Sequence, residues 1–261
     1  MLKLDGYTLK WIAIAGMVLS HLTYAFWDAW PMSVILPLGA LGGLTFPIMA
    51  FFLVEGYRHT SNIKRYVLRL VLFGVIATPF HIMVIGLPTL NIMFTLAVGL
   101  GTLALYDKMR RWVFWLVFLI LIIPVSTMVL EFQFLGVTTI LLYHIIRKER
   151  LKRIIPPVFM GIIGLLVGSA GWVHFAGLEA YGVALPEVDG GIFRNAHFMT
   201  DPDFMFVTIL FSIVILFVPV LLMAYTGERG RRMHRYTFYV IYPLHLAILA
   251  GFAFVFNGGG M

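Results

Sequence analysis

The sequence lacks cysteine and has few charged residues. Without cysteine, disulfides, thiolate metal sites and cysteine nucleophiles are excluded. Only 12% of the 261 residues are charged and 61% are hydrophobic, whereas soluble domains carry about 25% charged residues. So little charge cannot keep a globule of this size in water, but it suits a chain surrounded by a lipid bilayer. We therefore expect an integral membrane protein with a single membrane-embedded domain over residues 1–261.

Positive charge is in excess, with a formal net charge of +7. The basic residues occupy short intervals between apolar runs, where they set the orientation of a membrane protein. This distribution argues against nucleic acid as a partner. The chain also lacks the HExxH, P-loop and glycine-rich dinucleotide motifs, and we expect no bound metal.

Nine apolar runs are long enough, or nearly so, to form spans of about 20 residues. Lipid offers backbone groups no hydrogen-bond partners, so every span should be a helix. The sequence thus predicts an all-α, polytopic bundle of about nine transmembrane helices. The runs cover residues 8–27, 33–57, 65–87, 90–107, 111–130, 132–146, 154–174, 204–226 and 236–256.

Clusters of lysine and arginine follow every second run, as alternating topology requires. They place the amino terminus in the cytoplasm and the carboxyl terminus outside, with Arg194 as the one basic residue outside. The clusters are Lys3 with Lys10, Arg58 to Arg69, Lys108 to Arg111, Arg147 to Arg153, and Arg229 to Arg235. The long outer loop 175–203 is a gate, an acceptor-docking element or a simple connector.

Three histidines, His21, His81 and His245, lie inside predicted spans. Ionisable residues are costly in a bilayer, and they usually face the bundle interior or a wet cavity. Similar depths would allow the three to converge, and we treat them as candidate catalytic residues. The alternative is three separate histidines, each hydrogen-bonded across a helix interface.

Two features accompany these histidines along their helices. Lys10 precedes His21 on nearly the same helix face, roughly 16 Å away along the axis. It either binds the anionic head of a long cytosolic ligand or is a snorkelling topology signal. Tyr239 and Tyr242 lead to His245 at every third position, beside a proline that loosens the helix. We assign both tyrosines to a substrate pocket.

The most polar segment near a membrane face runs from Glu55 to Arg69. Glu55 lies inside the end of the second span, one turn before His59, and is a further candidate catalytic residue. Arg65 and Arg69 share a helix face, where two guanidinium groups can hold a phosphate. The candidate residues for binding an anionic donor are Arg58, His59, Lys64, Arg65, Arg69 and Lys10.

A small and polar stripe follows one face of the fourth span: Asn91, Thr95, Gly99 and Thr102. Such a stripe most often makes a helix–helix contact. A second interpretation is that Asn91 and Thr95 line a substrate pocket. The glycines Gly39, Gly42 and Gly43 of the second span indicate close helix packing.

Three stretches of the chain together carry a family pattern. They are residues 9–21 (LKWIAIAGMVLSH), residues 46–60 (FPIMAFFLVEGYRHT) continuing to 69, and residues 238–246 (FYVIYPLHL), with weaker similarity at 91–95 (NIMFT). In this order and spacing they resemble the TraX family of membrane acetyltransferases, named for the F-pilin acetylase. The matched positions are His21, Glu55, His59, His245, Arg65 and Arg69. One departure is Ser20, where the family pattern has an acidic residue before the histidine.

The resemblance implies an enzyme that transfers an acetyl group from cytosolic acetyl-CoA to an acceptor at the membrane, in bacteria the inner membrane. In the named member the acceptor is the amino terminus of pilin. A histidine titrates near working pH, so it suits the role of base or acyl carrier in such a transfer. The CoA phosphates would dock at the basic segment.

Two alternatives stay open. An O-acetyltransferase of a cell-surface glycan or lipid would use the same histidine and basic segment, and would differ only in its acceptor. A small proton-coupled transporter would use the intramembrane histidines as a relay, although the sequence shows no inverted repeat.

Overall fold

The computed structural model describes residues 3–27, 29–85, 89–180, 202–231, 234 and 236–256. Regular structure within these ranges is helical, apart from two isolated bridges. Residues 181–201 lie outside the described part, and with them most of the predicted outer loop and Arg194. The prediction of an all-helical protein is confirmed.

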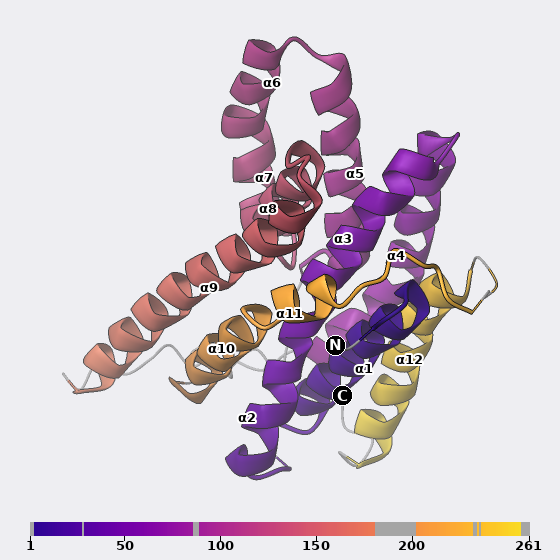
Figure 1. Ribbon diagram of the computed structural model, residues 1–261. Helices are drawn as coiled ribbons and strands as arrows, with labels where there is room; N and C mark the ends of the chain where they lie inside the picture. Colours follow the sequence, from indigo (N-terminus) through magenta and orange to yellow (C-terminus); the bar gives the residue numbers. More distant parts are fainter. Residues whose placement is uncertain are drawn as a thin grey trace.

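Each predicted span corresponds to one helical rod in the described chain (Figure 1). The rods are α1 (Gly6–Ala25), α2 with α3 (Met32–Leu41 and Thr45–His59, joined by the 3-10 turn Gly42–Leu44), α4 (Ile63–Ile85), α5 (Ile92–Lys108), α6 with α7 (Arg111–Val117 and Ile123–Val129, joined by the π-helical turn Phe118–Ile122), α8 (Gln133–Ile145), α9 (Glu149–Ala180), α10 with α11 (Pro202–Ile215 and Val218–Met223), and α12 (Thr237–Phe256). The largest differences are at α9, which begins at Glu149 rather than at residue 154 and ends at Ala180 rather than at residue 174.

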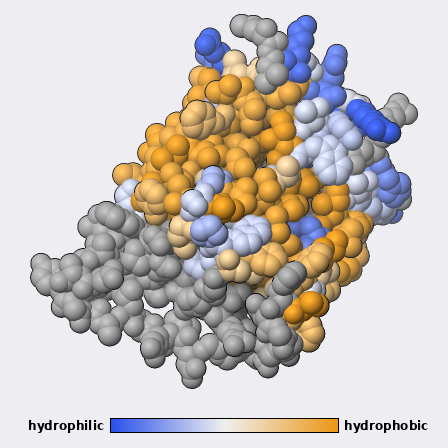
Figure 2. Space-filling view, turned by 90° about the horizontal axis from the view of Figure 1, so that it is seen from below, coloured by the Kyte–Doolittle hydropathy of each residue, from blue (hydrophilic) through white to orange (hydrophobic). Residues whose placement is uncertain are grey.

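Six of these rods are both long and apolar enough to cross a membrane. Of the other three, α1 carries a lysine, and α5 and α8 are short. Large apolar side chains face outward along the rods, and Ile120 and Met128 are 69% and 82% exposed. In Figure 2 the described surface is mostly orange, and hydrophilic residues gather mainly along its upper and right margins. The chain is an integral membrane protein.

Two of the three interrupted rods have an evident local reason for the break. Pro124 cannot donate a backbone hydrogen bond, and the π-helical turn just before it absorbs the misfit. In the second rod, a Cβ at Gly42 would lie 2.7 Å from Ser20 of α1, and a Cβ at Gly43 would collide with the carbonyl oxygen of Phe211 on α10. The close packing predicted for these glycines is confirmed.

The turns that carry the basic clusters lie at one end of the bundle, which we call the basic end. Tyr57 of α3 donates to Asp107 of α5 at 2.8 Å, and His144 of α8 pairs with the same carboxylate at 2.8 Å. Backbone hydrogen bonds attach the amino-terminal segment to the loop after α11, including Gly6 to Glu228 at 2.8 Å. Which side of the membrane this end faces stays a prediction.

Helices α5 and α8 lie in the interior and are unusually short. At 13 residues, α8 rises roughly 20 Å, less than the roughly 30 Å of a bilayer core. Both helices begin at one place, where Leu90 donates to Val129 and Glu131 donates to Leu90. Because these two helices are short, they leave a space next to their amino-terminal ends, and the longer helices of the bundle surround this space.

Candidate active site

The first and last helices meet at two histidines. Nδ1 of His21 on α1 lies 2.7 Å from Nε2 of His245 on α12, and both side chains are buried. The ring centroids are 5.0 Å apart and the ring planes differ by only 8°. This centroid separation is what two hydrogen-bonded imidazoles have when they lie end to end in one plane. The structure thus brings together two of the predicted catalytic residues.

A third contact fixes which nitrogen carries each proton. Nδ1 of His245 lies 3.0 Å from the carbonyl oxygen of Ile241, which can only accept a hydrogen bond. His245 therefore donates from Nδ1 and accepts at Nε2, so His21 must donate from Nδ1. The remaining nitrogen of His21, Nε2, keeps its lone pair. This series of hydrogen bonds orients the His21 ring and leaves its Nε2 able to act as a base or a nucleophile.

His81 of α4 lies beside this pair. Its side chain is fully buried, and neither ring nitrogen has a hydrogen-bond partner among the described residues. It is close enough to His21 for an electrostatic interaction between the two rings. The three predicted histidines are therefore neighbours in space.

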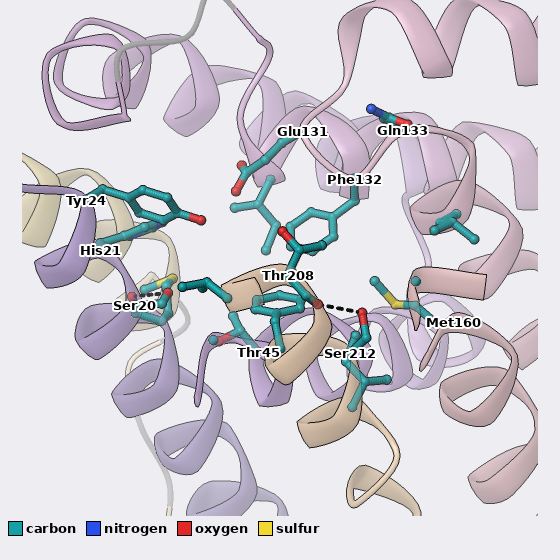
Figure 3. Close-up of a pocket in the computed structure, with 18 of the residues that line it drawn as sticks. Ser20, His21, Tyr24, Thr45, Glu131, Phe132, Gln133, Met160, Thr208 and Ser212 are labelled. Atoms are coloured by element: carbon teal, nitrogen blue, oxygen red, sulfur yellow. Dashed lines mark hydrogen bonds between the residues drawn. The ribbon is translucent and has the colours of Figure 1, made fainter. Parts of the chain in front are cut away.

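His21 opens onto a cavity of about 260 Å³, the histidine cavity. It occupies the space beyond the first turns of α5 and α8, and it is enclosed by α1, α3, α9, α10 and α12 as well. Tyr24 and Glu131 supply polar groups on the side of the cavity where His21 lies (Figure 3), and Tyr242 adds a further hydroxyl to the lining. The rings of Tyr24 and Tyr242 both lie 6.3 Å from the ring of His21. Tyr242 thus lines a cavity, and its assignment to a substrate pocket stays a prediction.

Glu131 reaches the histidine cavity from the turn between α7 and α8. Backbone hydrogen bonds to Leu90 hold this turn, and Gln133 adopts a positive φ of 46°, which is costly for a residue with a side chain. Burial raises the pKa of the Glu131 carboxyl to about 7. From the sequence Glu131 is expected to be only an acidic loop residue, because its burial depends on helices distant in the chain.

A second cavity, of about 240 Å³, lies in the half of the bundle nearer the basic end. Lys10 lines it, with its Nζ 4.8 Å from the ring of Phe52 and 5.1 Å from that of Phe238. We call it the lysine cavity. Neighbouring residues of α5 line the two cavities, with Ile92 in the lining of the histidine cavity and Met93 in that of the lysine cavity.

Part of the predicted basic segment borders the lysine cavity. The guanidinium of Arg69 lies 5.7 Å from the rings of both Tyr66 and Tyr239, and these tyrosines line the cavity. Arg65 is exposed one turn earlier on α4, and Lys64 is exposed next to it. Lys10, Arg69 and Arg65 therefore form a basic approach to one cavity.

Comparison with known proteins agrees with this arrangement. The profile of the family described as "TraX protein" matches residues 5–253. The chain belongs to the TraX family. A curated TraX-like relative, "Probable fimbrial assembly protein FimC, serogroup H1" of Dichelobacter nodosus, is 30% identical over 262 aligned positions, which cover 94% of each chain. No solved structure matches the chain.

In this TraX protein Glu55 does not join the histidines. Its carboxylate lies 2.7 Å from Nζ of Lys152 and 3.5 Å from Arg58, at the basic end. Lys152 is only 1% exposed and also pairs with Glu149 at 2.8 Å. Glu55 lines neither cavity, and its contacts make it a link between α3 and α9. A catalytic role for Glu55 stays a prediction, and the sequence did not indicate this pairing because the partner cation lies almost a hundred residues later, on another helix.

Two residues of the predicted donor site also lie elsewhere in the TraX bundle. Arg58 is engaged by Glu55, by Glu149 at 3.9 Å and by the carbonyl of His144. The ring of His59 pairs with the carbonyl of Glu55 at 2.8 Å. Neither residue lines a cavity described above, whereas Lys10 on α1 lines the lysine cavity and Arg69 on α4 lies beside it.

The polar stripe on α5 packs against neighbouring helices instead of lining a cavity. Asn91 caps α5 through Met93 at 3.1 Å and donates to the carbonyl of Gly74 on α4 at 2.9 Å. The methyl group of Thr95 packs against Gly136 of α8. Assignment of Asn91 and Thr95 to a substrate pocket is therefore corrected in favour of the helix–helix contact.

Proposed function

We propose that the chain is an acetyltransferase that moves an acetyl group from acetyl-CoA to an amine or hydroxyl acceptor at the membrane. The observation that carries this proposal is the hydrogen-bond chain from Ile241 through His245 to His21 at the wall of a cavity. It leaves a basic nitrogen facing a space large enough for a small acceptor group. The family of the F-pilin acetylase supports the same chemistry.

His21 acts as the base in the transfer. Its Nε2 accepts a proton from the acceptor while the acceptor's nitrogen or oxygen bonds to the thioester carbonyl carbon. The carbon–sulfur bond then breaks, the acetyl group stays on the acceptor, and the imidazolium returns the proton to the CoA thiolate. His245 stabilises the imidazolium, because its Nε2 accepts a hydrogen bond from His21 throughout.

The donor enters from the basic end, which we take as cytoplasmic. Arg65, Arg69 and Lys64 are placed to bind the phosphates of CoA, and Lys10 binds an anionic or carbonyl group of the arm further in. The lysine cavity then leads along α5 to the histidine cavity, where the thioester meets His21.

The acceptor belongs to pilus or fimbrial assembly at a bacterial inner membrane. The family takes its name from a pilin acetylase, and the Dichelobacter relative is named as a fimbrial assembly protein. An amino terminus of a pilin-like subunit is the acceptor that fits both. A glycan or lipid hydroxyl would use the same base and the same donor site.

Calorimetric titration of the purified protein in nanodiscs with acetyl-CoA tests the donor site. We expect binding, and the variant Arg65→Ala/Arg69→Ala should weaken it by about tenfold or more, since hydrogen bonds to charged groups contribute about 1.5–3 kcal/mol each. The control Arg147→Ala/Arg150→Ala removes two exposed arginines from another turn at the basic end. Absence of binding to the unmodified protein, or an equal loss in the control, would contradict the proposal.

A further inference from the structure

Glu131 is a carboxylate of the histidine cavity that the acetyl transfer described above does not use. Its turn is held by the Leu90 hydrogen bonds and by the strained backbone of Gln133. Figure 3 shows its carboxylate directed into the cavity, toward the hydroxyl of Tyr24. The Glu131 carboxylate is therefore held facing the cavity in which an acceptor would reach His21.

No cation neutralises Glu131 in the described part of the chain, and its Oε2 atom is buried without a hydrogen-bond partner there. Tyr24 from α1 and Tyr242 from α12 lie near enough to interact with its charge, and His21 from α1 lines the same cavity. Tyr242 contributes a second buried hydroxyl that has no partner among the described residues. The carboxylate also accepts a hydrogen bond from the backbone N–H of Ile92 at the start of α5, but this neutral donor leaves the negative charge uncompensated. A buried charge without a counter-charge is costly, so a positively charged ligand is a fitting counterpart.

The walls around this carboxylate are mostly apolar. Met17, Phe132, Met160 and Phe211 contribute large uncharged surfaces to the same cavity. A fitting ligand therefore combines one positive hydrogen-bond donor with a short apolar group. The amino-terminal residue of a peptide has both properties, whereas a sugar hydroxyl has neither a charge nor an apolar body.

We propose that Glu131 binds the ammonium group of an amine acceptor in the histidine cavity and removes its first proton. This inference rests on the proposed acetyl transfer and specifies its acceptor site. It also selects an amine over the glycan or lipid hydroxyl that the transfer chemistry alone permits.

Acetylation of an ammonium group has to remove two protons from its nitrogen. The first passes from the ammonium to the Glu131 carboxylate, which leaves a neutral amine and a carboxylic acid. The second passes to Nε2 of His21 as the amine bonds to the thioester carbon, and it then reaches the departing CoA thiolate. Burial raises the pKa of Glu131 to about 7, and α-amino groups titrate at about 7.7–8.0, so the first transfer is nearly balanced in energy.

Two small probes separate charge recognition from apolar binding. L-phenylalaninamide carries an ammonium group, and L-3-phenyllactamide has a hydroxyl in its place. Calorimetry in nanodiscs should show that the protein prefers the amine. Glu131→Gln should weaken binding of the amine by about tenfold or more, because it removes a charge-assisted contact, and should leave binding of the hydroxyl analogue unchanged.

Three comparisons make the outcome decisive. Glu131→Asp, which keeps the charge, should retain part of the preference for the amine. Glu149→Gln, which removes an exposed carboxylate at the basic end, should leave amine binding unchanged. Binding of the amine to the unmodified protein should weaken as the pH falls below about 7, because Glu131 then becomes neutral.

Equal affinities of the unmodified protein and Glu131→Gln for the amine would overturn this inference, as would failure of the amine to bind. Titration of both proteins with acetyl-CoA runs beside these measurements. If acetyl-CoA binds both equally while the amine binds neither, only the role of Glu131 is wrong. If acetyl-CoA binds neither, the proposed acetyl transfer itself is wrong.

Discussion

The hydrogen bond between His21 and His245 predicts that the two residues act as a unit in catalysis. His21→Ala removes the base, and loss of general-base catalysis typically costs about 10²–10⁴ in rate. His245→Ala leaves the base but removes the acceptor for Nδ1 of His21, 2.7 Å away. An unpaired buried donor costs about 1–3 kcal/mol, which corresponds to roughly a 5- to 150-fold loss.

The decisive measurement is the double variant. Once His21 is absent, His245 has no base to orient, so His21→Ala/His245→Ala should be no slower than His21→Ala alone. Transfer of radiolabelled acetyl groups to a peptide amine, in nanodiscs and at saturating donor, measures all four rates. His245→Gln provides the conservative control, because its side-chain oxygen can accept from His21 and should restore part of the rate.

Independent action of the two histidines would give another pattern. The two single losses would then multiply in the double variant, and the orienting role of His245 would be refuted. A loss in His245→Ala that comes only from a higher Michaelis constant for acetyl-CoA would also refute it, because the geometry predicts a lower turnover number. Thermal midpoints of all variants should accompany the rates, to separate catalysis from folding.

Two further predictions concern stability. Gly43→Val should lower the thermal midpoint in detergent, with a cost of about 1–3 kcal/mol or more, because its Cβ meets the backbone carbonyl of Phe211. Gly101→Val is the control, since nothing lies near a Cβ at that position. Equal midpoints for the two variants would contradict the close approach at Gly43. Asn91→Ala should lower the free energy of unfolding by about 1–2 kcal/mol, because α5 loses its cap and the hydrogen bond to Gly74 is lost. Asn91→Asp should recover the contribution of the cap. An unchanged thermal midpoint for Asn91→Ala would refute the capping role.

Much of the fold follows directly from the sequence. Apolar runs and basic clusters predict each helical rod within a few residues. Segments that cross lipid must be helical, and their hydropathy distinguishes them from segments in water. The start of α9 was missed because four of the five residues from Glu149 to Arg153 are charged and the segment was assigned to a loop. Helix-forming charged residues at the basic end do not register in a hydropathy pattern.

The site was only partly predictable. His21 and His245 stand out because buried ionisable residues are expensive in a bilayer, but their contact joins positions 224 residues apart. Glu55 stood out for the same reason, and it proved to be neutralised by Lys152 on α9. Glu131 was missed because a carboxylate between two apolar runs is typical of an exposed loop. Local patterns indicate which residues are costly, whereas only the packing shows whether a partner exists.

The pairing of the first helix with the last has a consequence for biosynthesis. His21 enters the membrane early during translation, whereas His245 follows 224 residues later. Until then His21 lacks its hydrogen-bond acceptor and the histidine cavity lacks one wall. For the proposed acetyltransferase, activity therefore begins only after α12 has been inserted and has packed against α1.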